Sequence, residues 1–234
     1  MSNKPCVFLL PGLMCDEAIW QHQAAALAPF ADVRIPVFRG FTSLRDMATS
    51  VLQQAPEKFS VAGHSMGGRV VWELLDLAGK RIERIAVMDS GVHPVKPGEK
   101  EKREILLQAA QQRGLQAVAD AWIKPMLHPD HHADQKLLAE ITAMLLRNTI
   151  TDFAGQIQAL LGREDRNEFL RTIEQKVWLL VGDQDGWSTP AQHEHMQSLL
   201  PCSELRIIRD AGHMSTMEQP EAASKLLVEW LHDK

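Results

Sequence analysis

The hydrophobic pattern of the 234-residue chain alternates between short apolar runs and longer stretches of helical periodicity. Runs of about four to eight apolar and β-branched residues are typical of buried strands, and apolar residues spaced three and four apart are typical of helices. The pattern predicts strands over residues 7–10, 33–38, 58–62, 84–89, 176–182 and 205–208. It predicts the intervening helices over residues 16–27, 43–55, 68–75, 190–200 and 220–231.

This alternation is interrupted in the middle of the chain. Residues 93–172 contain no convincing strand, and their periodicity predicts helices over residues 101–112, 115–126, 135–147 and 152–161. Alternating strands and helices imply a mostly parallel sheet with right-handed crossovers and helices on both faces. We therefore expect an α/β core built from residues 1–92 and 173–234, with an all-helical lid subdomain over residues 93–172 inserted in it.

Composition excludes several classes of function. The formal net charge of −5, without any basic run, argues against nucleic acid as a partner. The three cysteines are widely spaced, which gives no disulfide or zinc framework and suits a reducing compartment. The apolar run near the N-terminus is too short for a signal peptide, and no run reaches transmembrane length. We expect a cytoplasmic monomer or homodimer that acts on a small molecule and has no membrane partner.

The pentapeptide Gly63-His64-Ser65-Met66-Gly67 fits the pattern G-x-S-x-G, in which a serine lies on a tight turn between a strand and a helix. An apolar run precedes it, a helical stretch follows it, and Gly68 adds another small residue. Such a turn projects the serine hydroxyl free of the sheet, and the helix N-terminus favours developing negative charge. The pattern therefore indicates Ser65 as a candidate nucleophile, with His64 as a structural residue whose side chain points away from the pocket.

A nucleophilic serine needs a base, and the base needs a carboxylate to orient it. Loops that follow the carboxyl ends of parallel strands meet at one edge of the sheet, where ligands bind. Asp185 and His213 each follow a predicted strand downstream of Ser65, in the order Ser, Asp, His that hydrolases use. Rival carboxylates also follow predicted strands: Asp89, Asp183 and Asp210.

These residues together resemble the α/β-hydrolase superfamily, and within it the small serine esterases and enol-lactonases. The resemblance spans nearly the whole chain and is carried by residues 10–20, 63–68, 182–190 and 211–213. It implies the α/β-hydrolase fold with about six strands, since the family's N-terminal hairpin has no room before residue 7. It also implies site roles: Ser65 as nucleophile, His213 as general base and then acid, Asp185 as orienting acid, and the backbone N–H groups of Leu13 and Met66 as the oxyanion hole.

The chain departs from the family after its first predicted strand. Pro11 stands where the family usually has a histidine, whose side chain often braces the oxyanion loop. Cys15, just beyond this loop, is either a small packed residue or part of the site lining. The proline at position 11 removes no group that the resemblance assigns to catalysis.

Residues that bind substrate are harder to identify. Trp187, close to Asp185, and the pair Trp122 and Met126 on a predicted lid helix are candidate pocket walls, although their spacing also fits a hydrophobic core. Arg69 follows the turn of Ser65; in the related menaquinone-pathway synthases an arginine there helps hold a carboxylated substrate, and arginine is also common there as a plain surface residue. Further candidates for anion binding lie in the predicted lid: Arg103, Arg113, Arg147 and Arg163.

A cluster of histidines and acids also lies in the predicted lid. Its members are His128, Asp130, His131, His132 and Asp134. Their spacing does not fit a zinc site, so we interpret the cluster as a solvated loop.

The sequence therefore predicts a serine hydrolase that cleaves a small carboxylic ester, lactone or thioester through an acyl-enzyme. We expect no metal or cofactor, because backbone donors would polarise the scissile carbonyl group. One alternative keeps the triad for C–C bond hydrolysis, for elimination as in the menaquinone-pathway synthases, or for acyl transfer, since a fold does not fix a reaction. Another alternative is a non-catalytic ligand-binding protein that retains these residues.

Overall fold

The computed structural model of the protein describes residues 4–233, and its centre is a sheet of six parallel strands. The order across the sheet is β2-β1-β3-β4-β5-β6, and every neighbouring pair is parallel. This confirms the predicted α/β-hydrolase fold class with a sheet of six strands. The strands are β1 (Cys6–Leu10), β2 (Asp32–Arg34), β3 (Phe59–His64), β4 (Ile82–Met88), β5 (Val177–Gly182) and β6 (Ser203–Ile208).

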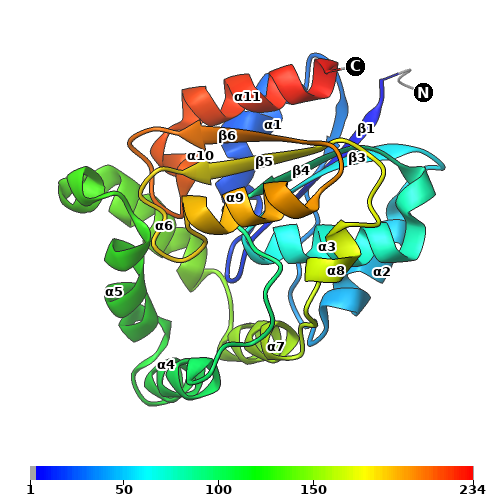
Figure 1. The fold of residues 1–234 in the computed structure, drawn as a ribbon. Coiled ribbons are helices and arrows are strands. Elements are labelled where there is room, and N and C mark those ends of the chain that lie inside the picture. The colour runs from blue at the N-terminus through cyan, green and yellow to red at the C-terminus, as the bar shows by residue number, and fades with distance from the viewer. Residues whose placement is uncertain (1–3, 234) are drawn as a thin grey trace.

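Helices cover both faces of the sheet (Figure 1). Successive strand residues point to opposite faces, so Val7 and Leu9 join one hydrophobic core while Phe8 and Leu10 join the other. Helices α1 and α11 pack together on the first face, and α2, α3 and α9 cover the second. Their bounds are α1 (Gln21–Leu27), α2 (Leu44–Gln54), α3 (Met66–Ala78), α9 (Pro190–Leu199) and α11 (Pro220–His232).

Residues 93–172, between β4 and β5, form what we call the helical insertion. Its longer helices lie together beyond the carboxyl ends of the strands (Figure 1), where α4 packs on α5 and α7, and α5 packs on α6. No strand lies within this range, all of which the structure describes. The helices are α4 (Glu99–Arg113), α5 (Leu115–Met126), α6 (Gln135–Leu146), α7 (Ile150–Leu161) and α8 (Asn167–Leu170).

Two predicted elements differ from those in the structure. The strand predicted over 33–38 is wrong in extent: β2 ends at Arg34, because Pro36 has no N–H and cannot continue the ladder. The helix predicted over 16–27 is divided into a 3-10 turn, η1 (Glu17–Trp20), and α1. The sequence pattern also did not predict four other short elements: η2 (Gly79–Arg81), η3 (Pro129–Ala133), α8 (Asn167–Leu170) and α10 (Ser215–Glu218).

The strand order brings the loops after β1 and β3 to one point on the carboxyl edge of the sheet. The chain runs from β1 outward to β2 and then returns to β3 on the other side of β1, which creates a topological switch point. The first turn of α3 touches the end of β1 there, since a Cβ added to Gly67 would lie 2.1 Å from the Leu10 carbonyl oxygen. Glycine at position 67 is therefore what allows this approach.

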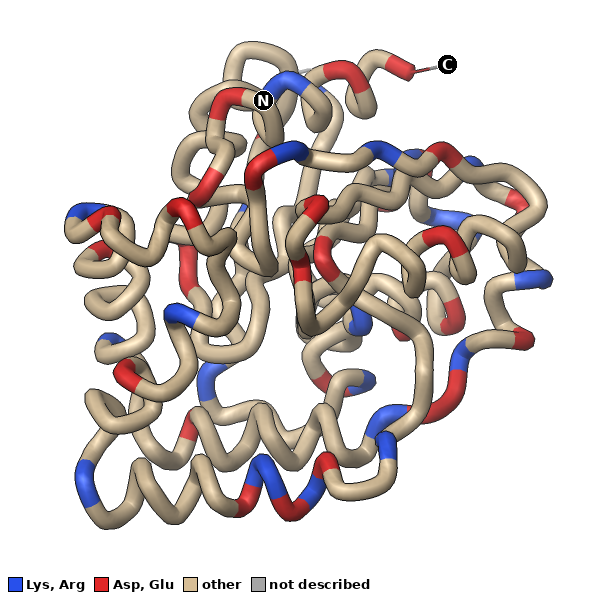
Figure 2. Tube along the Cα trace, turned by 60° about the vertical axis from the view of Figure 1, so that its left-hand side comes forward, with Lys and Arg blue, Asp and Glu red and all other residues tan. Residues whose placement is uncertain are grey.

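Acidic and basic residues are mixed over the molecule, including along α4 (Figure 2). None of the helices within residues 4–233 is long and apolar enough to cross a membrane.

Gly67→Ala should lower the free energy of unfolding by about 1–3 kcal/mol, because its methyl group would collide with backbone atoms that cannot move independently. The matched control is Gly79→Ala, where the nearest atom is a Gln175 side-chain nitrogen 3.8 Å away and the backbone is helical. The control should change stability by less than about 1 kcal/mol. Urea denaturation measures both variants, and equal effects would contradict the close approach of α3 to β1.

Candidate active site

Ser65 lies on the sharp turn between β3 and α3, and its backbone has φ 53° and ψ −114°. Non-glycine residues rarely adopt a positive φ, and such a conformation costs about 1–3 kcal/mol. Neighbouring strands hold it in place: the Ser65 N–H donates to the Met88 carbonyl at 2.9 Å, and the Ser90 hydroxyl donates to the Ser65 carbonyl at 2.6 Å. The turn therefore presents the Ser65 side chain at the carboxyl edge of the sheet.

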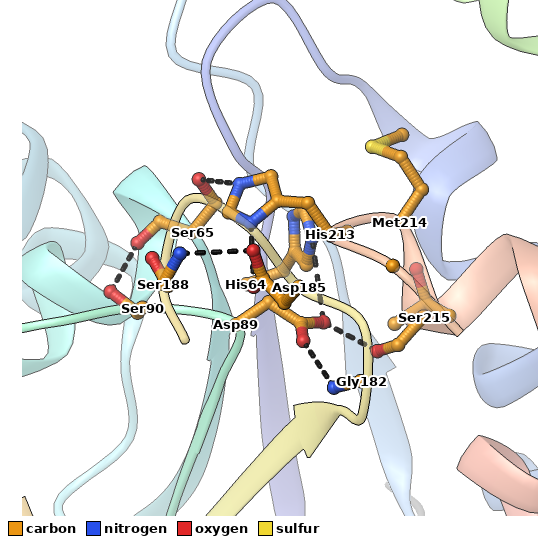
Figure 3. A network of polar contacts seen from close by, with 12 residues as sticks. His64, Ser65, Asp89, Ser90, Gly182, Asp185, Ser188, His213, Met214 and Ser215 are labelled. Atoms are coloured by element: carbon orange, nitrogen blue, oxygen red, sulfur yellow. Dashed lines mark hydrogen bonds and ion pairs between the residues drawn. The ribbon is translucent and has the colours of Figure 1, made fainter. Parts of the chain in front are cut away.

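The structure brings Ser65, His213 and Asp185 together in one hydrogen-bonded chain (Figure 3). His213 Nε2 lies 2.9 Å from Ser65 Oγ, and His213 Nδ1 lies 2.8 Å from Asp185 Oδ2. Because a carboxylate only accepts hydrogen bonds, Nδ1 carries the hydrogen and Nε2 is free to accept one from the hydroxyl group. This is the arrangement in which an imidazole can remove the proton of a serine.

Asp185 is held in its ionised form. Burial raises its pKa, but the charge and hydrogen bond of His213 and the N–H groups of Ser188 and Trp187 outweigh burial and bring the pKa to about 2. Burial lowers the pKa of His213, but the negative charge and hydrogen bond of Asp185 raise it by more, so the net shift is upward. The pair therefore stabilises the imidazolium that forms when His213 accepts a proton.

The two rival carboxylates of neighbouring strands have other partners. Asp89 accepts hydrogen bonds from the Gly182 N–H at 2.9 Å and from the Ser215 hydroxyl group (Figure 3). Burial, and the nearby Asp185 charge, raise the pKa of Asp89 well above its usual range, which favours the protonated form of this side chain. Asp183 accepts a hydrogen bond from the Ala211 N–H at 3.3 Å.

His64 lies behind the catalytic histidine candidate rather than beside the serine hydroxyl. Its Nε2 atom donates to the His213 carbonyl oxygen at 2.7 Å, and its ring packs edge-on against Trp20. Burial lowers the pKa of His64 to about 3, so the ring is neutral. The side chain thus supports the His213 backbone.

Leu13 and Met66, the residues expected to supply the oxyanion-hole N–H groups, line the same cavity as Ser65. Neither of these N–H groups donates to an acceptor within the part of the chain that the structure describes. The loop after β1 also approaches the serine closely, since a Cβ added to Gly12 would lie 3.2 Å from Ser65 Cβ. The two free donors are thus available to an oxygen atom on a ligand.

A cavity of about 490 Å³ opens over Ser65 between the sheet edge and the helical insertion. Three candidate pocket residues line it: Trp122 and Met126 from α5, and Trp187 from the loop after β5. The Trp187 ring lies 5.3 Å from the His213 ring and 5.1 Å from the Trp122 ring, measured between centroids. These aromatic groups form an apolar wall next to the triad candidates.

Another wall of the cavity is basic, although the whole chain is acidic. Glu99 is the one carboxylate in the lining, where Arg163 and Arg103 hold it by charged hydrogen bonds. Arg69 has no carboxylate partner among the described residues and donates instead to the His93 carbonyl at 3.1 Å. Burial and the nearby Arg163 lower the pKa of Arg69 to about 9, so it stays charged at neutral pH. The basic members of the wall are Arg69, Lys96, Lys102, Arg103 and Arg163.

Two of the predicted anion-binding arginines lie elsewhere. Arg147 forms a bidentate ion pair with Asp16, at 2.7 and 2.8 Å, and Arg113 is exposed at the end of α4. Cys15 lines the cavity, but burial raises its pKa to about 12, so the thiol is protonated.

The histidine cluster of the insertion belongs to a buried contact with the His213 loop. The Glu218 carboxylate accepts hydrogen bonds from the N–H groups of Gly212 and Met214, on either side of His213. Its second oxygen accepts from the His128 N–H and from His131 Nδ1, at 2.7 and 2.9 Å. The cluster is therefore not simply a solvated loop, because part of it fixes the insertion to the base loop.

Sequence reasoning missed several polar residues of this region: Asp89 as the partner of Gly182 and Ser215, His93, Lys96, Glu99, Lys102, Gln156 and Glu218. Glu99 and Lys96 lie near the start of a predicted helix, where charged residues are ordinary. The partners that give Gln156 and Glu218 their importance are far away in the sequence or on another element. One sequence contains no local signal that ranks them above other polar residues.

We expect the His213 imidazole to titrate above the ordinary histidine value of 6.5, which NMR of its ring protons measures. Asp185→Asn should lower this pKa, because burial remains while the carboxylate charge is lost. Asp183→Asn, which alters a carboxylate that has no contact with the ring, should leave it nearly unchanged. Equal shifts in both variants would contradict the assigned pairing.

Known proteins resemble this chain in sequence and in fold. The sequence matches the Alpha/beta hydrolase family over residues 7–225. A Bacillus subtilis protein, whose name proposes it as a 2-succinyl-6-hydroxy-2,4-cyclohexadiene-1-carboxylate synthase, is 25% identical over 194 residues, which cover 80% of this chain and 70% of that protein.

Two solved structures have closely similar folds. An enol-lactonase from Burkholderia xenovorans superposes with a TM-score of 0.90 at 23% identity, over 99% of this chain and 93% of that one. A thermophilic esterase from Thermogutta terrifontis, solved with malate bound, gives 0.88 at 24% identity, over 99% and 90% of the two chains. At such identities the likeness shows the fold alone. The family match, which covers most of the chain, shows that this protein is a hydrolase enzyme of the alpha/beta hydrolase family.

Proposed function

We propose that the protein is a serine hydrolase that cleaves a small carboxylic ester, lactone or thioester through an acyl-enzyme intermediate. The observation that carries this proposal is the chain from Ser65 Oγ through His213 to Asp185, with distances of 2.9 and 2.8 Å, at the floor of a cavity. These distances suit proton transfer, and the raised pKa of His213 suits a base that must hold the proton in the transition state.

In the proposed acylation step, Ser65 Oγ attacks the carbonyl carbon while its proton moves to His213 Nε2. The tetrahedral intermediate then collapses, the bond to the leaving group breaks, and His213 returns the proton to that group. Water, deprotonated by His213, attacks the acyl-enzyme in the same way and releases the acid with Ser65 restored. Asp185 remains ionised throughout and stabilises the imidazolium.

The negative oxygen of each tetrahedral intermediate would lie between the N–H groups of Leu13 and Met66. Both residues line the cavity, and their N–H groups have no acceptor among the described residues. An oxyanion-hole donor contributes about 2.7–4 kcal/mol to lowering the barrier. In this scheme the backbone polarises the carbonyl, and His213 and Asp185 handle the proton.

The basic wall supports a substrate that carries a carboxylate. Arg69 is a half-buried cation without an anionic side-chain partner among the described residues, and such a charge is stabilised when a ligand supplies the missing anion. Arg69 lies one helical turn beyond Ser65, so a carboxylate bound there would belong to the same small molecule as the scissile group. The Bacillus subtilis relative is named for a carboxylate product, and the esterase structure holds malate.

The same basic wall favours a second candidate function, an elimination or C–C bond cleavage on a carboxylated substrate. In this reaction His213, with Ser65 and Asp185, would abstract a proton, and the cationic wall would hold the negative charge of the substrate. Acyl transfer to an acceptor other than water is a further reaction of this site. The Bacillus subtilis relative, which is named as a synthase, supports the second candidate function.

We also propose that the helical insertion, residues 93–172, acts as a lid subdomain on a core of residues 1–92 and 173–234. Its residues Trp122, Met126 and Arg163 form walls of the cavity over Ser65. We place the protein in the cytoplasm, because its free cysteines suit a reducing compartment. We expect it to be a monomer or a homodimer.

A fluorophosphonate probe should label the wild type, and Ser65→Ala should lose both labelling and at least about 10³-fold in kcat toward p-nitrophenyl esters and lactones. The control Ser198→Ala, on the exposed face of α9, should behave as the wild type. Labelling without turnover of any ester, lactone or thioester would favour the second candidate. Neither labelling nor turnover would indicate a ligand-binding protein.

A carboxylate preference should appear as a higher kcat/KM for mono-p-nitrophenyl succinate than for its methyl ester. Arg69→Met should reduce that ratio about 10- to 100-fold, the effect of losing about 1.4–2.8 kcal/mol of charge-assisted binding. Arg113→Met, an exposed lid arginine outside the cavity lining, is the matched control and should leave the ratio unchanged. A neutral-ester preference in the wild type would refute the carboxylate assignment.

A further inference from the structure

The loop between β1 and η1, residues 11–16, is held by side chains of the helical insertion. The Met14 N–H donates to Gln156 Oε1 at 2.8 Å, and the Met14 carbonyl accepts from Asn148 Nδ2, also at 2.8 Å. Asp16, at the end of the loop, is paired with Arg147. Three insertion residues therefore contact the segment that contains the proposed oxyanion donor Leu13.

These contacts satisfy a backbone that could not hold its shape alone. Met14 is fully buried and has φ 61°, a conformation that non-glycine residues rarely adopt. Its N–H and carbonyl groups have no hydrogen-bond partner other than Gln156 and Asn148 in the described chain. A buried backbone group without a partner is destabilising, so loss of either side chain would favour a different loop conformation.

Gln156 is well placed to transmit the position of α7 to the loop. It is almost fully buried, and its amide nitrogen donates to the Phe38 carbonyl at 2.9 Å while its oxygen accepts from Met14. Both ends of the amide are therefore used, and the side chain has one orientation that satisfies both. On the same helix, Asp152 accepts from the Gly40 N–H at 2.9 Å, which further fixes α7 to the core.

We propose that Gln156 and Asn148 are positioning residues for the oxyanion hole, so that the docked insertion sets where the Leu13 N–H points. This rests on the proposed function, in which Leu13 and Met66 bind the developing negative charge. The Met66 donor is fixed by the turn of Ser65, whereas the Leu13 donor lies next to Met14, whose two backbone groups are held from outside the core. The insertion thus contributes to transition-state stabilisation as well as to the pocket walls.

The test compares Gln156→Met, which keeps the length of the side chain but neither hydrogen bond, with Gln156→Glu, which keeps an acceptor for Met14. Gln158→Met, an exposed position on the same helix, is the matched control. Kinetics use the p-nitrophenyl ester that the wild type cleaves best. Amide hydrogen exchange of the peptide covering residues 12–16 reports the loop without depending on activity.

We expect Gln156→Met to speed exchange in residues 12–16 and to reduce kcat about 10- to 100-fold with KM within about threefold, because a displaced donor acts in the transition state. Gln156→Glu should recover part of the kcat, and Gln158→Met should match the wild type in both readouts. Asn148→Ala provides the same test if Gln156→Met does not fold.

Two outcomes would overturn the proposal. Unchanged exchange in residues 12–16 would show that Gln156 does not hold the loop. Faster exchange with an unchanged kcat would show that its role is only structural. A wild type without hydrolytic turnover would instead refute the proposed function, and the exchange result would still decide whether Gln156 holds the loop.

Discussion

The backbone of Ser65 has a conformation that non-glycine residues rarely adopt, and the packing of the sheet edge holds it there. Its N–H and carbonyl groups are bound by Met88, the last residue of the neighbouring strand β4, and by Ser90, which follows that strand. Gly67 and Gly68 leave room on the other side, against the end of β1 and the Ser90 side chain. Because three elements meet at this turn, its geometry is fixed before any ligand binds, which is what preorganised catalysis requires.

Charge around the turn follows a simple arrangement. Asp185 is ionised next to His213, the pKa of Asp89 is raised by burial, and Glu99 is paired with Arg163 and Arg103. Arg69 differs from these groups, because it is half-buried and charged but has no carboxylate partner among the described residues. Local compensation thus leaves the positive charge of Arg69 open to a ligand, close to the proposed nucleophile.

The sequence predicted the fold well because its signals are local. The alternation of strands and helices, the tight turn at Ser65 and the carboxyl-edge positions of Asp185 and His213 are all visible in short segments of the chain. The structure brings these three side chains together, and it brings two of the four lid arginines, Arg103 and Arg163, to the cavity. The extent of β2 was mispredicted, since apolar residues continue past the point where Pro36 ends the ladder.

What the sequence did not reveal depends on contacts between distant residues. Gln156 is an ordinary polar residue within a helical stretch, and its role arises only because α7 packs over a loop 142 residues earlier. Arg147 was a candidate for anion binding, but the fold pairs it with Asp16 instead. Glu218 joins the insertion to the His213 loop through partners that the sequence does not place beside it. Such residues are recognised once the topology is known.

The central claim is that Ser65 forms a covalent acyl intermediate. Rapid mixing of the protein with excess mono-p-nitrophenyl succinate, acid quenching, and intact-protein and peptide mass spectrometry test it directly. The account predicts one added succinyl group on the peptide that contains Ser65, formed in a burst and lost as turnover proceeds. Product formation without any adduct on Ser65, or an adduct on another residue such as Cys15 that forms at the turnover rate, would contradict it.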